Sequence, residues 1–276
     1  IDAGTLELVR SYGVEIKSSA DLIQLFVATL SPAAIETHWD AGRRMDRLRH
    51  AAFEEIRGAL VNGREITEFE MQTWLKNAFQ REGLVTDHGP IVATNAHAAD
   101  PHYEPRSEYS SVIGSGDLIL IDMWAKLDRQ EAVYYDITWT AFAGSKVPTE
   151  IEKVFSIVAR ARDTAFQRVE SALAEGQALR GFEVDDAARD VISSAGYGKA
   201  FIHRTGHSIT QDVHGTGSNM DNLETHDDRL LLPNTVFSIE PGIYLEHFGI
   251  RSEFNVLTSP RSAQITGEVQ HSILLL

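Results

Sequence analysis

Residues 118–124 read LILIDMW and residues 132–138 read AVYYDIT, with the polar triplet DRQ at residues 128–130 between them. Two apolar runs rich in β-branched and aromatic residues, separated by a polar turn, are typical of a β-hairpin. The hairpin predicts that Asp122 and Asp136 lie on adjacent strands and face the same side. An ionised aspartate in apolar surroundings is costly unless it is paired or bound to a metal ion. One such aspartate would indicate a salt bridge or a turn, whereas two raise the question of a shared site.

Histidines gather in the second half of the chain. His203, His207 and His214 lie within twelve residues, around the glycine of the sequence RTGH. If residues 201–207 form an extended strand, His203 and His207 share a face, because side chains alternate along a strand. A lone histidine is more often a hydrogen-bonded core residue, but three around one glycine favour a functional site.

Two glutamates complete the pattern. Glu240 ends the apolar run VFSIE at residues 236–240, and Glu253 ends the run GIRSE at residues 249–253. Arg251 and Glu253 are two positions apart and share a face of a strand, so an ion pair is the simpler interpretation of these two residues. That interpretation leaves Glu240 unexplained.

Four carboxylates and one imidazole therefore stand in strand-like surroundings: Asp122, Asp136, His207, Glu240 and Glu253. This hard, oxygen-rich set has enough negative charge to hold two divalent cations with a shared water between them. We expect manganese, while zinc, cobalt and iron also suit these ligands.

Helix signals in the first half follow a simple order. Ser31-Pro32 is typical of the N-cap and first turn of a long helix, which we expect to run to about Val61. Thr67 and Glu70 form a capping box that opens a shorter helix ending near Gly83.

The second half repeats that order. Pro148-Thr149 starts a long helix that ends near Gly176, and a short helix follows over about 184–195. Strand-like stretches follow each helix pair, at roughly 84–142 and 201–259. Although the recurrence could be coincidental, we interpret it as two pseudo-equivalent halves of one α+β domain.

Composition excludes several classes of protein. Of 276 residues, 43% are hydrophobic and 24% charged, and the net charge is −15, which argues against a nucleic-acid partner. No apolar run reaches about 18 residues, so we expect no membrane span. The absence of cysteine excludes disulfides and thiolate metal sites. The first residues do not resemble a secretory signal, and we expect a cytoplasmic protein.

These ordered stretches resemble the M24-type metallopeptidases of the pita-bread fold, which include methionine aminopeptidases, Xaa-Pro aminopeptidases and Xaa-Pro dipeptidases (prolidases). The resemblance covers about residues 31–276. Its carriers are LID (120–122), YDIT (135–138), GH (206–207), DVH (212–214), IEPG (239–242) and IRSE (250–253). It implies the pita-bread (creatinase/aminopeptidase) fold, in which two pseudo-symmetric ααββ halves surround a curved antiparallel sheet.

The resemblance implies how the metal ions are held. Asp122 would bind one ion, Asp136 and Glu253 would bridge the two ions, and His207 and Glu240 would complete the coordination.

It also implies catalytic and substrate-binding groups. Glu240 would carry the proton of the attacking water to the leaving amine. His102 and His214 would hydrogen-bond the peptide and the tetrahedral intermediate. His203 and Arg251 would bind the substrate.

The Xaa-Pro branch fits better than the methionine branch, because a histidine precedes the ligand histidine by four positions and because GIRSE is present. The expected substrate is a short peptide with proline second, and the expected assembly is a homodimer. Residues 1–30 contain a helical pattern and a strand-like run at 13–16. They resemble the end of the N-terminal creatinase-like domain of those enzymes and its linker, and residues 31–276 resemble the catalytic domain.

The sequence departs from the family pattern at two places, and the second departure bears on substrate preference. Asp122 and Asp136 are 14 positions apart, a few more than is usual, which lengthens the tip of the hairpin but not its base. Trp124 and Trp139 replace a glycine and an arginine that are common at those places.

Three functions are consistent with these residues. The first is a two-metal peptidase for Xaa-Pro bonds. The second is a metal-dependent hydrolase of a non-peptide C–N bond on the same fold. The third is a peptide-binding module without catalysis, against which the complete ligand set argues.

Overall fold

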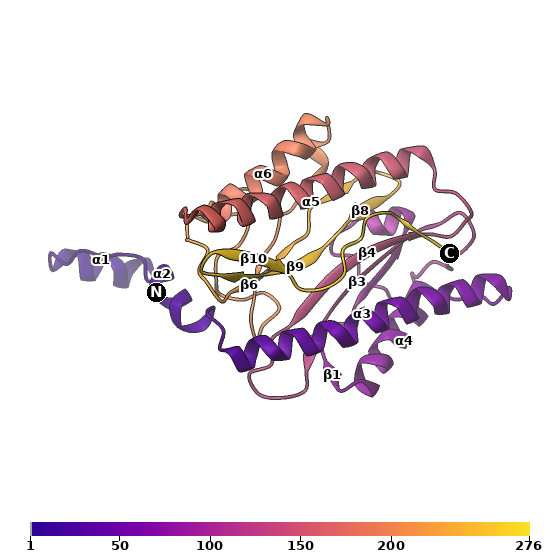
Figure 1. Cartoon of the computed structure of the whole chain (residues 1–276), viewed down its shortest axis with the longest axis horizontal. Helices are drawn as coiled ribbons and strands as arrows, with labels where there is room; N and C mark the ends of the chain where they lie inside the picture. The colour runs from indigo at the N-terminus through magenta and orange to yellow at the C-terminus, as the bar shows by residue number, and fades with distance from the viewer. Residues whose placement is uncertain (1) are drawn as a thin grey trace.

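Two helix pairs alternate with two groups of strands along the chain, as the sequence predicts (Figure 1). The computed structural model describes residues 2–276, so Ile1 of the expected N-terminal segment lies outside the described residues. The helices are α1 (Ala3–Ser11), α2 (Ala20–Val27), α3 (Pro32–Val61), α4 (Glu68–Arg81), α5 (Thr149–Glu175) and α6 (Gly181–Ser194), with the short 3₁₀ helices η1 (Asn95–Ala99) and η2 (Gly198–Ala200). The strands are β1 (Leu84–Val85), β2 (Ile91–Thr94), β3 (Leu118–Leu127), β4 (Tyr135–Phe142), β5 (Ser208–Ile209), β6 (Val236–Ile239), β7 (Gly242–Tyr244), β8 (Gly249–Arg251), β9 (Phe254–Ser259), β10 (Ser262–Ile265) and β11 (Leu274–Leu275).

Most of the predicted helix ends are confirmed, but α6 begins at Gly181, earlier than expected, where the Glu183 side chain accepts from the Arg180 amide. The Ser31 hydroxyl accepts a hydrogen bond from the amide three residues on at 3.1 Å, and Pro32 occupies the first turn of α3. Thr67 and Glu70 form the expected capping box at α4. Gly176 ends α5 with a φ of 71°, which glycine adopts without strain. Local sequence rules thus determine where these helices begin and end.

β3 and β4 form the predicted hairpin. In their antiparallel register Asp122 lies opposite Thr138, and Trp124 lies opposite Asp136. The two aspartates are therefore two positions out of register. Because alternate residues of a strand share a face, both carboxylates point to the same side of the sheet.

Two segments expected to be strands are not. Residues 132–134 belong to the hairpin turn, because the Val133 amide donates to the Thr37 hydroxyl at 2.9 Å and the Tyr134 amide to the Thr210 carbonyl at 3.0 Å, away from β3. Residues 201–207 are irregular, although the His207 carbonyl accepts from the Ser238 amide of β6 at 2.9 Å just before β5 begins.

Side-chain amides join the two halves. The strands of the first half form a sheet in the order β1-β3-β4-β11, with β2 also on β3, and its strand β11 comes from the C-terminus. The second half forms the sheet β10-β9-β6-β5 and the separate hairpin β7–β8. Asn255 of β9 donates to the Asp136 carbonyl at 2.7 Å and accepts from the Asp136 amide at 2.9 Å. Gln270 makes the same pair of hydrogen bonds with Thr140. Only the short β4–β11 pair among the described strands is parallel.

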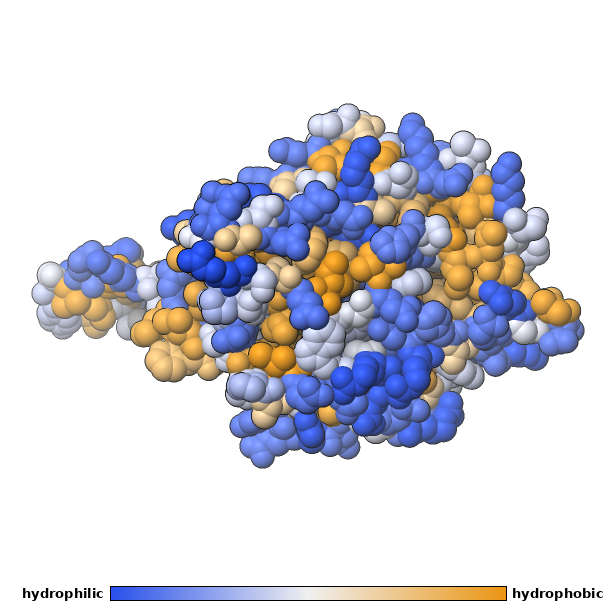
Figure 2. All heavy atoms as spheres, in the orientation of Figure 1, coloured by the Kyte–Doolittle hydropathy of each residue, from blue (hydrophilic) through white to orange (hydrophobic). Residues whose placement is uncertain are grey.

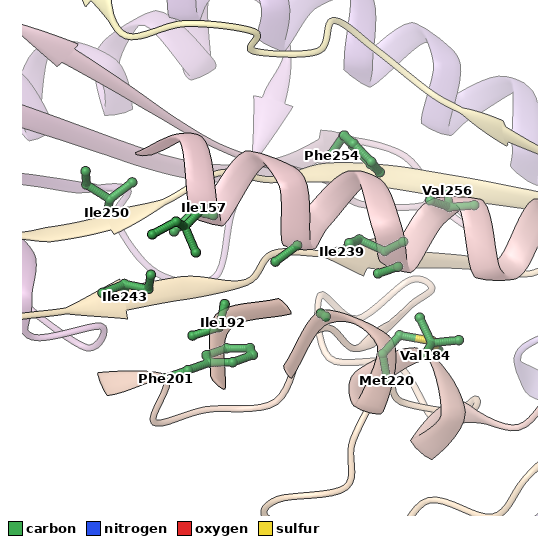
Figure 3. Close-up of a cluster of buried hydrophobic side chains, with 14 of the residues drawn as sticks. Ile157, Val184, Ile192, Phe201, Met220, Ile239, Ile243, Ile250, Phe254 and Val256 are labelled. Atoms are coloured by element: carbon green, nitrogen blue, oxygen red, sulfur yellow. The ribbon is translucent and has the colours of Figure 1, made fainter. Parts of the chain in front are cut away.

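Each half has its own hydrophobic core. Figure 3 shows the core of the second half, where Ile157 of α5 lies near Ile243 of β7 and Ile250 of β8. In the first half, Phe53 of α3 belongs to one cluster with Ile119 of β3. In Figure 1, α5 and α6 lie along the upper side of the strands and α3 and α4 along the lower side. The site described below lies where the two halves meet.

The N-terminal helices project from this body at the left of Figure 1. Gln24 of α2 attaches the segment by donating to the Leu230 carbonyl at 3.2 Å. Leu22, Leu25 and Phe26 are exposed, and Figure 2 shows hydrophobic side chains at this end of the molecule. The strand-like run at 13–16 forms no strand. Within residues 2–276, the helices are all too short or too polar to cross a membrane.

Candidate metal centre

The five residues expected to bind metal meet in one cluster. Ligand atoms of Asp136, His207 and Glu253 lie within 4.8 Å of one another, and the three side chains are buried. His207 Nε2 lies 3.5 Å from Asp136 Oδ2 and 3.2 Å from Glu240 Oε1. Asp122 lies beside Asp136 and lines the same cavity. Three carboxylates thus lie close to the His207 imidazole, and Asp122 extends the cluster along the wall of the cavity.

Two hydroxyl groups that the sequence did not predict as part of the site donate hydrogen bonds to the glutamates. Thr138, two residues after Asp136, donates to Glu253 Oε2 at 2.8 Å. Ser238, two residues before Glu240, donates to Glu240 Oε1 at 2.9 Å and accepts from the His207 amide at 2.9 Å. Their spacing of two from an acidic residue is the sequence signal that could have identified them.

Two carboxylate oxygens at the centre have no hydrogen-bond partner among residues 2–276: Asp136 Oδ1 and Glu253 Oε1. Asp136 is 5% exposed and Glu253 is 1% exposed. A buried polar atom without a partner costs about 1–3 kcal/mol, and more when it is charged. Divalent cations prefer such hard oxygen donors, so the residues present fit a metal site.

Burial makes three of the carboxylates difficult to ionise. It raises the pKa of Asp136 to about 7, although the hydrogen bond with His207 opposes the shift. It also raises the pKa of Glu253 well above its ordinary value, and the neighbouring carboxylates add to the effect. For Asp122, burial raises the pKa against the opposing charge of Arg251. A cation in the cluster would remove this penalty.

Glu240 and His207 behave as an ion pair. Burial opposes ionisation of Glu240, but the hydrogen bond and charge of His207 outweigh it and hold the pKa of Glu240 below its usual range. Burial likewise opposes the charged form of His207, yet hydrogen bonds to Asp136 and Glu240 raise its pKa to about 10. The His207 imidazolium is therefore the group that neutralises Glu240.

The cluster forms part of the wall of a cavity of about 600 Å³, a size that accommodates a small ligand. Its lining includes eight of the nine expected site residues: His102, Asp122, Asp136, His203, His207, His214, Glu240 and Arg251. Glu253 is the exception and lies behind this wall.

Tyr244, which the sequence analysis gave no role, joins the two expected substrate-binding residues. Its hydroxyl lies 2.7 Å from His203 Nε2 and accepts from Arg251 Nη1 at 2.9 Å. Arg251 is 3% exposed and also donates to the Asp122 carboxylate. The simple ion pair between Arg251 and Glu253 is wrong, because Arg251 pairs with Asp122. Substrate binding by His203 and Arg251 stays a prediction.

The two expected catalytic histidines reach the cavity from different halves. The rings of His214 and His207 meet edge to face, with centroids 4.5 Å apart. Burial, aided by the charges of His207 and Arg204, lowers the pKa of His214 to about 4, so its ring is neutral near pH 7. His102 is exposed and follows η1. Both rings line the cavity, although sequence separates them by more than a hundred positions.

Comparisons with known proteins point to one family. The model of "Metallopeptidase family M24" matches residues 36–260. The chain is 28% identical over 274 residues to the "Probable dipeptidase PepE" of Mycobacterium tuberculosis, covering 98% of this chain and 67% of that protein. It is 29% identical over 215 residues to an Xaa-Pro dipeptidase of Lactobacillus delbrueckii subsp. lactis, covering 77% of this chain and 52% of that protein. The crystal structure of an X-Pro aminopeptidase from Thermotoga maritima matches with a TM-score of 0.79 and 28% identity, covering 93% of this chain and 67% of that chain. The chain therefore spans about half to two thirds of the length of these relatives.

Proposed function

Since the chain belongs to metallopeptidase family M24, we propose that it uses two divalent metal ions to hydrolyse the bond between an N-terminal residue and a following proline. It has the α+β pita-bread fold of a hydrolase that acts on peptide bonds. Relatives named for Xaa-Pro substrates, in sequence and in structure, support the choice of bond.

One observation carries the metal part of the proposal. Asp136, His207 and Glu253 bring ligand atoms within 4.8 Å of one another, and two of their oxygens have no hydrogen-bond partner within residues 2–276. Oxygen donors so close together, with raised pKa values, favour a cation between them. Asp122 and Glu240 extend the set to the five ligands that two ions need.

The metal ions and the residues that line the cavity would have separate roles in peptide hydrolysis. Bound divalent ions would polarise the scissile carbonyl and make water a stronger nucleophile. Glu240, a carboxylate in the wall of the cavity, would accept the proton of the attacking water and pass it to the leaving amine. His102 and His214 would donate hydrogen bonds to the carbonyl oxygen as it gains charge. His203 and Arg251 would orient the peptide.

The finer expectations rest on the sequence alone. Manganese as the metal, a homodimer, a cytoplasmic location and an N-terminal segment 1–30 distinct from a catalytic domain 31–276 stay predictions.

Metal content and peptide specificity test the proposal together. We expect two ions of Mn²⁺ or Co²⁺ per chain, and hydrolysis of Ala-Pro that exceeds hydrolysis of Ala-Ala. A chelator should abolish turnover, and added metal should restore it. Glu240→Gln should lower kcat by roughly 10²–10⁴-fold, the usual loss when a general base is removed. Glu246→Gln, an exposed neighbour, serves as the matched control and should keep full activity.

The alternatives give different results. Turnover of small amides but of no peptide would favour hydrolysis of a non-peptide C–N bond. A folded protein that binds no metal in calorimetry would favour the peptide-binding module. Either result contradicts the proposal.

A further inference from the structure

A fully buried carboxylate lies at the start of the short helix in the first half. Glu68 of α4 is 0% exposed, and both of its oxygens accept hydrogen bonds. Oε1 accepts from the Thr94 amide at 2.7 Å and from the Thr94 hydroxyl at 2.8 Å. Oε2 accepts from the Tyr103 hydroxyl at 2.7 Å and from the Ser111 amide at 2.9 Å. His97 Nδ1 lies 2.9 Å from the same oxygen.

These donors are spread along one loop that borders the cavity. Thr94 ends β2, and Ser111 directly precedes the bridge between Val112 and Thr67 at the start of α4. The rings of His97 and Tyr103 stack at 4.4 Å, which fixes the middle of the loop. His102 and Tyr103 line the cavity. One buried carboxylate therefore holds the segment 94–111 at its start, middle and end.

The short helix of the second half has an equivalent residue. Asp185 of α6 is 0% exposed, and its Oδ1 accepts from the Thr205 amide at 2.9 Å and from the Thr205 hydroxyl at 2.7 Å. Its Oδ2 accepts from the Asn222 amide at 3.1 Å. Arg189, which pairs with Asp185, donates to the His203 carbonyl at 2.9 Å.

The two arrangements share one contact. In each half the short helix supplies a buried acid, and one threonine gives that acid both its amide and its hydroxyl. The threonine begins or lies in an irregular segment that carries site residues: His102 after Thr94, and His203 and His207 around Thr205. Backbone hydrogen bonds also hold the second segment, because the Glu240 amide donates to the Thr205 carbonyl at 2.7 Å and Gly206 forms a bridge with Met220. The bonds to the buried acids add a side-chain anchor at the threonine of each segment, which helps to determine where the neighbouring side chains lie.

We propose that Glu68 and Asp185 are a pair of positioning residues, one for the loop of the catalytic histidine His102 and one for the segment of the metal ligand His207. The assignment of roles to His102 and His207 rests on the proposed function. We call Glu68 with Thr94 the Glu68 clamp and Asp185 with Thr205 the Asp185 clamp. Loss of each clamp should affect a different property of the protein. The Glu68 clamp affects catalysis without metal binding, and the Asp185 clamp affects metal binding itself.

Glu68→Gln and Asp185→Asn test this division. We expect Glu68→Gln to lower kcat by about tenfold or more, because small displacements of catalytic groups are costly, while the Kd for Mn²⁺ stays unchanged. We expect Asp185→Asn to weaken Mn²⁺ binding by about 10–100-fold, as for other residues that support a metal ligand. Amide exchange followed by mass spectrometry should accelerate at Thr94 and Ser111 in the first variant and at Thr205 and Asn222 in the second.

Matched variants separate positioning from general destabilisation. Glu65→Gln and Asp190→Asn are exposed neighbours of the two acids and should change none of these measurements. Thr94→Val and Thr205→Val remove only the hydroxyl, so they replace the acid variants if those do not fold. Thr94→Ser and Thr205→Ser keep the hydroxyl and should restore the original values.

Equal losses of kcat and metal affinity in both variants would overturn the proposal, and so would unchanged amide exchange at the four named amides. A protein that binds Mn²⁺ but cleaves no peptide would defeat the proposed function alone. In that case, metal affinity and local amide exchange still show whether the Asp185 clamp supports the metal ligand and whether each clamp orders its segment.

Discussion

Asp136 and Glu253 each place a carboxylate oxygen in the interior with no hydrogen-bond partner within the described chain. Folding tolerates such atoms when something else satisfies them. Their pKa values are raised by burial, which means that protons occupy the cluster when cations do not. Proton and metal therefore compete for the same oxygen atoms.

This competition predicts how metal affinity depends on pH. The pKa of Asp136 is raised to about 7 and that of His207 to about 10, and both groups must lose a proton before they bind a cation. Affinity for Mn²⁺ should therefore rise from pH 5.5 to 8, by about tenfold per pH unit for each proton released. Above pH 7 the rise should continue more gently, because His207 still releases its proton. Calorimetry in two buffers of different ionisation enthalpy measures the number of protons.

Asp136→Asn provides the comparison. It removes one titrating group, so the number of protons released near pH 6 should fall by about one. A Kd that stays constant across this pH range would contradict the raised pKa values.

At the scale of elements, Asn255 contributes two hydrogen bonds to the joint between β4 and β9. Asn255 is 0% exposed, and its amide pairs with both the amide and the carbonyl of Asp136. This side chain therefore connects the two sheets by hydrogen bonds, as backbone groups connect the strands within each sheet. It also fixes the backbone of a residue that we expect to bind metal.

Asn255→Ala should therefore destabilise the protein. The change leaves a buried amide and a buried carbonyl without partners, at about 1–3 kcal/mol each. Chemical denaturation should show a free energy of unfolding lower by about 2–5 kcal/mol. Asn77→Ala, on the exposed face of α4, should cost almost nothing. A loss at Asn255 no larger than that at Asn77 would show that the joint does not depend on this side chain.

Element types follow the sequence where the rules are local. Ser31, Thr67 and Gly176 mark helix ends through contacts within a few residues, and the hairpin at Asp122 follows from alternation and a polar turn. Similar apolar patterns occur at residues 201–207 and 132–134. Their backbone groups, however, form hydrogen bonds with residues that are distant in the sequence. Val133 donates to Thr37, a contact that no local pattern reveals.

At the scale of the whole molecule, the candidate ligands come from both halves. Asp122 and Asp136 belong to the first half, and His207, Glu240 and Glu253 belong to the second. Ions bound between them would tie the halves together only in the folded state. Unfolding would then require the release of metal.

Metal should therefore stabilise the whole fold. At a free Mn²⁺ concentration of 100 times its Kd, binding to the folded state alone adds about 2.7 kcal/mol. For a chain of this size, we expect Tm to rise by roughly 5–10 °C. Scanning calorimetry across a metal titration measures the shift, and Glu253→Gln should reduce it strongly. A Tm that does not change with metal concentration would show that the halves are not joined in this way.

The sequence by itself determined the helix order, the hairpin, the α+β class and the identity of the acidic and imidazole residues. It did so because helix caps, strand alternation and residue chemistry are local properties. Only the tertiary structure decided that Arg251 pairs with Asp122, that Thr138 supports Glu253 and that Glu68 and Asp185 hold the loops of the cavity. Those contacts join residues far apart in the chain, and their positions depend on how the two halves pack.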